Sequence, residues 1–95
     1  MTAEPAPLRF TGAIRYWRPE QAAGLAVVEV PAELVPRFGG LKQRRVRGTV
    51  NGVSFASSAM PAGNGVLAIS VSKATMKAAG ATVGEAAEFA IDEVG

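Results

Sequence analysis

The chain has 95 residues, a net charge of +2 and 48% hydrophobic residues, which together indicate one globular domain. It contains no Cys and no His, so disulfides, thiolate nucleophiles, zinc–thiolate sites and histidine general bases are excluded. The N-terminal part lacks a basic start followed by an apolar run, and no apolar stretch is long enough to cross a membrane as a helix. We therefore expect a cytoplasmic protein with no membrane partner.

Two strands are predicted near the start of the chain. Residues 1–7 hold two prolines among small and polar residues, which indicates a flexible tail, and residues 8–95 are expected to form the single domain. Residues 8–17 alternate between two faces and carry aromatic and branched side chains, which predicts a strand. A loop over residues 18–24 leads to a second, mainly apolar strand over residues 25–30.

A hairpin at Asn51-Gly52 is the clearest local feature of the sequence. Residues 31–35 predict a short helical turn ending near residue 39, followed by strands over residues 42–50 and 53–60. Asn-Gly between two alternating runs favours a type I′ turn, which fixes how the strands pair. The predicted pairs are Val50 with Val53, Thr49 with Ser54, Gly48 with Phe55, Arg47 with Ala56, Val46 with Ser57, and Arg45 with Ser58.

The last third of the chain predicts a turn, a strand, a helix and a final strand. Residues 61–65 are expected to reverse the chain, and residues 66–71 form an apolar strand. Ser72 is an N-cap for a helix over residues 73–79, which Gly80 ends. The predicted core consists of Phe10, Ile14, Val28, Val46, Phe55, Leu67, Ile69, Val71, Phe89 and Ile91.

The chain contains a weak internal repeat. Residues 28–35 align by pattern with residues 69–76, and each segment continues through a short helical turn to a glycine and then into a strand. Two such units predict a mostly β fold, namely a small β-barrel of about six strands. Two short helices cap this barrel, and a pseudo-twofold repeat relates its halves.

Three segments resemble a bacterial family known as domain of unknown function 1905. They are residues 45–55 with residues 60–65, the helical segment 73–80, and Gly84-Glu85. The resemblance covers residues 8–94. It implies a small split β-barrel related to the swapped-hairpin barrel of AbrB-like regulators, and it brings no catalytic residues.

Basic residues gather in the middle of the sequence. No Asp or Glu occurs between Leu34 and Gly84, whereas seven cations do: Arg37, Lys42, Arg44, Arg45, Arg47, Lys73 and Lys77. Such a surface is typical of a site that neutralises phosphates of nucleic acid or another polyanion. The alternative is a solvated strand whose long cations keep an exposed edge from pairing with other chains.

Trp17 offers a second candidate contact. It lies between Arg15 and Arg18, and nucleic-acid bases stack on exposed rings. The alternative is a tryptophan packed on the barrel rim beneath an arginine.

These observations favour a non-enzymatic binding module that takes nucleic acid or another polyanion. A protein-interaction domain is the alternative, followed by a small-molecule-binding barrel with enzymatic activity. We predict no catalytic residues, metal site or cofactor, and either a monomer or a homodimer.

Overall fold

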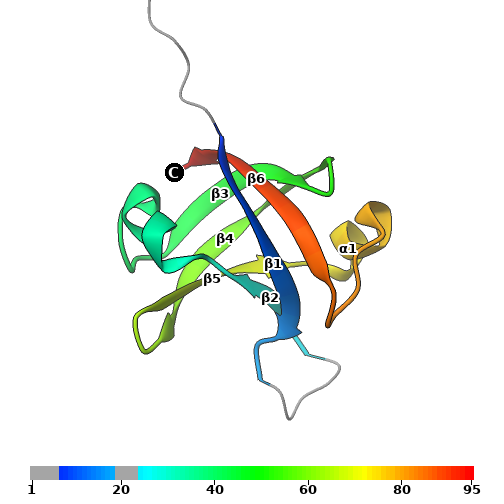
Figure 1. Ribbon diagram of the computed structural model, residues 1–95, viewed down its shortest axis with the longest axis horizontal. Helices are drawn as coiled ribbons and strands as arrows, with labels where there is room; N and C mark the ends of the chain where they lie inside the picture. Colours follow the sequence, from blue (N-terminus) through cyan, green and yellow to red (C-terminus); the bar gives the residue numbers. More distant parts are fainter. Residues whose placement is uncertain (1–6, 19–23) are drawn as a thin grey trace, which may run out of the picture.

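The structure, a computed structural model, describes residues 7–18 and 24–95. Six strands and two short helices follow one another along the chain (Figure 1). They are β1 (Leu8–Tyr16), β2 (Ala26–Glu29), the 3-10 helix η1 (Ala32–Phe38), β3 (Arg44–Val50), β4 (Val53–Gly63), β5 (Val66–Val71), α1 (Lys73–Ala79) and β6 (Ala86–Val94). The predicted tail up to residue 6 and the centre of the predicted loop, residues 19–23, lie outside the described residues.

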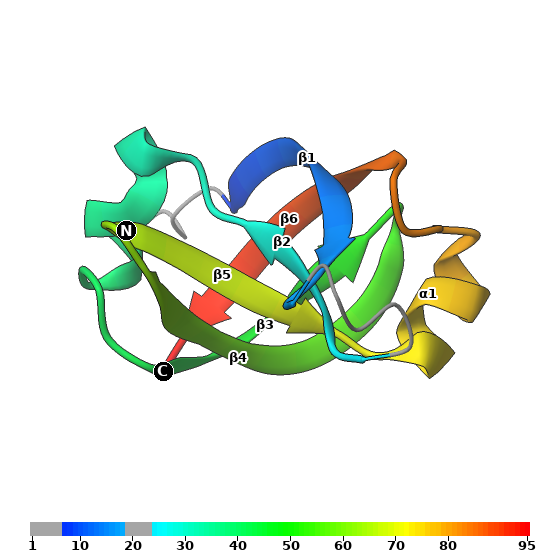
Figure 2. The same cartoon turned by 90° about the horizontal axis from the view of Figure 1, so that it is seen from below.

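The strands close into an antiparallel barrel in the order β1-β2-β5-β4-β3-β6. The predicted mostly β barrel of six strands is therefore confirmed, and so are the two short helices. η1 and α1 lie at opposite ends of the barrel, as Figures 1 and 2 both show. No helix in the described part of the chain has the length and apolar character needed to span a membrane.

The β3–β4 hairpin has the predicted register. All six predicted residue pairs are present, from Val50 opposite Val53 to Arg45 opposite Ser58. Asn51 and Gly52 form the turn with φ of 48° and 83°, which is the left-handed conformation of both central residues in a type I′ turn.

The second hairpin turns later than the sequence predicts. β4 continues through Pro61 to Gly63, and the turn itself is Asn64-Gly65 rather than the whole of residues 61–65. The ladder between β4 and β5 shifts between Pro61 and Gly63, because a proline has no N–H to donate and is accommodated at an irregularity.

The helix ends follow local rules. The Ser72 hydroxyl accepts a hydrogen bond from the backbone N–H of Thr75, and Gly80 ends α1 in the left-handed conformation, as predicted. η1 runs to Phe38 and ends at Gly39, so the predicted helical turn continues past Pro36.

The barrel interior is filled by alternating side chains. Nine of the ten predicted core residues are buried. The tenth, Phe10, is half-buried and stacks on Phe89 with ring centroids 5.2 Å apart. Phe55 meets the same Phe89 ring edge to face. Phe38, which the sequence did not mark as core, is completely buried because η1 folds onto the barrel.

Candidate nucleic-acid interface

The cations of residues 37–47 come from three consecutive parts of the chain. Arg37 lies in the last turn of η1, Lys42 in the following loop, and Arg44, Arg45 and Arg47 in β3. All are exposed except Arg44, which is half-buried. We call this set the β3 basic cluster.

Arg45 and Arg47 project from the outer face of β3. They alternate with the buried Val46 and Gly48, so their Cα atoms lie about 7 Å apart on one side of the strand. Their partners on β4 are Ser58 and Ala56, and neither β4 nor β5 contains a carboxylate. The surface over β3 and β4 is therefore cationic and lined by small neutral side chains.

Carboxylates border this surface on its other side. Glu93 of β6 lies opposite Arg47, and the ladder shifts beside it so that Asp92 forms a bulge. Both acids are exposed, and both line a shallow depression with Arg47 and Ser54. These two acids therefore offset part of the positive charge around Arg47.

The charges of the cluster are not used in ion pairs. Within residues 7–18 and 24–95, the only carboxylate and cation within 4 Å of each other are Glu29 and Arg15. The exposed guanidinium and ammonium groups of the cluster are thus available to an external anion.

Arg44 has a different position from its neighbours. It is in phase with Val46 and so points toward the barrel end beneath η1. Its guanidinium packs on Gly39, where an added Cβ would lie 3.0 Å from one terminal nitrogen. Its Nε is buried without a hydrogen-bond partner among the described residues. We therefore assign Arg44 to the closure of the barrel end rather than to the exposed face.

Lys73 and Lys77 are separated from the β3 basic cluster. Both are exposed on α1, one helical turn apart, and α1 lies at the opposite end of the barrel from η1 (Figures 1 and 2). The six exposed cations of the predicted set of seven therefore lie on two separate surfaces, and Arg44 belongs to neither.

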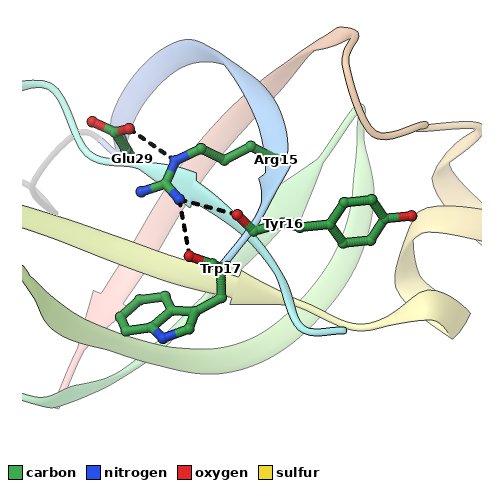
Figure 3. A network of polar contacts seen from close by, with 4 residues as sticks. All are labelled: Arg15, Tyr16, Trp17 and Glu29. Atoms are coloured by element: carbon green, nitrogen blue, oxygen red, sulfur yellow. Dashed lines mark hydrogen bonds and ion pairs between the residues drawn. The ribbon is translucent and has the colours of Figure 1, made fainter. Parts of the chain in front are cut away.

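Arg15 makes intramolecular contacts that the sequence did not reveal (Figure 3). Its Nε donates to Oε2 of Glu29 at 2.9 Å, and its Nη1 donates to the backbone carbonyls of Tyr16 at 3.1 Å and Trp17 at 3.5 Å. These contacts tie the end of β1 to β2. Arg15 and Glu29 are 14 residues apart and are brought together by the pairing of β1 with β2. The alternation pattern within one strand could not identify this pair.

Trp17 is half-buried, and its indole points away from the Tyr16 ring (Figure 3). Its backbone N–H donates to the carbonyl of Leu25 at 2.6 Å, which closes the connection between β1 and β2. Arg18 is exposed immediately after it. Among the described residues, Arg18 is thus free of the contacts that hold Arg15, which is bound by Glu29 and by the backbone carbonyls of Tyr16 and Trp17.

A small apolar pocket lies between the barrel and α1. Its volume is about 140 Å³, and its lining includes Tyr16, Leu25, Ala26, Met76 and Val83. Leu25 is 47% exposed at the mouth of this pocket. No local sequence pattern indicates this pocket, since its lining comes from five separated segments.

No group of three or more Asp or Glu side chains that could hold a metal ion occurs in the part of the chain that the structure describes.

Comparison with protein families assigns the chain to a family. Residues 10–91 match the model of a family described as Domain of unknown function (DUF1905). This match spans most of the chain, so the chain belongs to that family, in agreement with the resemblance noted in the sequence. Comparison with curated proteins gives no significant match.

Proposed function

We propose that this member of the DUF1905 family is a non-enzymatic module that binds the phosphate backbone of nucleic acid in the cytoplasm. Arg45 and Arg47 would make the central contacts, with Arg37 and Lys42 adding charge from the η1 end. Such contacts neutralise phosphates without reading bases, so binding is weak, independent of sequence and strongly dependent on salt.

One observation carries the proposal. Two exposed arginines share one face of β3, neither is within 4 Å of a carboxylate of the described residues, and their β4 neighbours are small and uncharged. Small neighbours let a phosphate backbone approach the guanidinium groups closely. The carboxylates of β6 would repel an anion near them, so we expect the phosphate backbone to lie over β3 and β4 rather than over β6.

The test is a fluorescence anisotropy titration with short DNA and RNA duplexes at about 50 mM salt, where phosphate contacts are screened least. The unmodified protein should bind at micromolar concentration. The double variant Arg45→Glu, Arg47→Glu should lose binding and stay folded, because both side chains are exposed.

A matched control separates local contact from net charge. The double variant Lys73→Glu, Lys77→Glu changes the net charge by the same amount at the other end of the barrel. It should weaken binding much less than the arginine variant. Absence of binding by the unmodified protein, or equal losses in the two double variants, would contradict the proposal and leave a protein partner as the leading alternative.

A second candidate function, binding of a small apolar ligand, is supported by the pocket beside α1. Its volume of about 140 Å³ is close to that of an apolar cavity in another protein, about 150 Å³, which holds benzene. Titration with benzene or indole should move the NMR signals of Met76 and Val83 while leaving those of β3 unchanged. Unchanged Met76 and Val83 signals at saturating probe would exclude this function.

We also propose that the barrel has a pseudo-twofold repeat like that of AbrB-like barrels. Each half of the chain consists of two strands, a short helix and a third strand. Exchanging β1 with β4, β2 with β5 and β3 with β6 leaves the set of paired strands unchanged, which supports the proposal. Superposition of the two halves in an experimental structure tests it.

A further inference from the structure

The barrel contains two Asn-Gly turns that are closely matched in backbone conformation. Asn51-Gly52 joins β3 to β4, and Asn64-Gly65 joins β4 to β5. The asparagines have φ of 48° and 54°, the glycines have φ of 83° and 76°, and all four residues are exposed. The Asn-Gly pair itself and its solvent access are therefore alike in the two turns, whereas the preceding residue is Val50 in one and Gly63 in the other.

The two asparagine side chains differ in their hydrogen bonds. Asn51 Nδ2 donates to the carbonyl of Ala79 at 3.2 Å, and Asn51 Oδ1 accepts from the backbone N–H of Glu88 at 2.9 Å. The backbone N–H of Asn51 also donates to the carbonyl of Glu88. The side chain of Asn64 has no hydrogen-bond partner within residues 7–18 and 24–95. Both the nitrogen and the oxygen of the Asn51 side-chain amide are therefore hydrogen-bonded. No such bond opposes rotation of the Asn64 side chain within the described residues.

Rotation of the side chain decides whether an Asn-Gly pair can react. Asparagine is chemically labile, and a following glycine leaves its backbone nitrogen unhindered. In the reaction, that nitrogen loses its proton and attacks the side-chain Cγ, a ring C–N bond forms, and the side-chain amide leaves as ammonia. Water then opens the ring at either carbonyl and produces aspartate or isoaspartate. The attack requires the amide to leave its existing hydrogen bonds.

We propose that Asn64 is a site of spontaneous deamidation in the folded protein and that Asn51 is protected. Each hydrogen bond that must break slows the reaction by a factor of several, so two of them should make Asn51 roughly tenfold slower than Asn64. The product adds one negative charge at the tip of the β4–β5 hairpin, at the end of the barrel that carries η1 (Figures 1 and 2).

The test is incubation of the purified protein at mildly alkaline pH and physiological temperature, followed by peptide mass spectrometry. Chymotryptic cleavage after Phe55 separates the two asparagines into different peptides. Aspartate and isoaspartate should accumulate at residue 64 roughly tenfold faster than at residue 51. The variant Asn64→Gln should remove the fast phase.

A second arm distinguishes structural protection from local sequence. In a denaturant that unfolds the barrel, both asparagines lose their contacts, so their rates should become similar. Equal rates in the folded protein would overturn the proposal, and so would a roughly tenfold difference that persists undiminished after unfolding. Both arms are independent of nucleic-acid binding.

Discussion

Gly48 leaves less room for a side chain than any other glycine of the described residues. It lies on β3 between β4 and β6, and a Cβ added to it would be 1.9 Å from the carbonyl oxygen of Ala90. The β6 backbone approaches here because the ladder shifts next to Gly48. A backbone atom cannot move aside as a side-chain end can, so the position requires glycine.

We therefore predict that Gly48→Ala destabilises the protein by about 3 kcal/mol or more, the upper range for overpacking. Gly12→Ala is the matched control, because its added Cβ would meet a methyl group of Val28, at 2.8 Å, rather than backbone. Chemical denaturation should show a much smaller loss for Gly12→Ala. Similar losses of stability for both variants would show that the contact with the Ala90 backbone is not what prevents a side chain at residue 48.

Phe89 joins the aromatic residues of the core. It is 2% exposed, and its ring contacts Phe10 face to face and Phe55 edge to face. Phe89→Ala should lower the free energy of unfolding by about 3–5 kcal/mol, the range for deleting a core aromatic. Phe10→Ala should cost less, because Phe10 is only half-buried. A larger loss for Phe10→Ala in urea denaturation would contradict this ranking.

At the scale of elements, the β3–β4 hairpin is fastened to the rest of the molecule through its turn. Asn51 links this turn to the C-terminal end of α1 and to β6 through the contacts described above. These contacts hold α1 against the barrel end, where it has no fully buried residue of its own.

Asn51→Ala should therefore destabilise the protein by about 1–3 kcal/mol, the sum expected for two net hydrogen bonds. Asn64→Ala removes the same left-handed asparagine from the matched turn without removing such bonds. The difference in stability between the two variants, measured by thermal and chemical denaturation, isolates the contribution of the two side-chain hydrogen bonds of Asn51. Equal destabilisation would show that only the turn conformation matters.

Local patterns were sufficient to predict several elements of the fold. Asn51-Gly52 defined the register of its hairpin, and Ser72 with Gly80 defined both ends of α1. These features depend on neighbouring residues alone. The burial of Phe38 and the pairing of Arg15 with Glu29 depend on how the barrel closes, so no local pattern revealed them.

The candidate site was predictable only in part, for the same reason. Alternation correctly assigned Arg45 and Arg47 to the exposed face of β3. Composition could not show that α1 lies at the other end of the barrel from η1, or that Glu93 lies opposite Arg47. Cations counted together along the sequence can therefore lie on separate surfaces of the barrel. The sequence then overestimates the positive charge of any one surface.

At the scale of the whole molecule, charge is unevenly distributed although the net charge is only +2. Cations occupy the outer face of β3, and acids occupy the adjoining strand β6. A phosphate backbone bound over β3 and β4 would release its counterions in proportion to the arginines that it contacts. The number of contacts is therefore measurable without knowing the natural partner.

The most direct test of this account is the salt dependence of duplex DNA binding by the unmodified protein and by the double variant Arg45→Gln, Arg47→Gln. Each phosphate contact contributes about 0.9 to the slope of log affinity against log salt on B-DNA. The two neutral substitutions should thus make the slope shallower by about 1.8 units. A slope that stays unchanged, or binding of the unmodified protein that does not respond to salt, would contradict the account.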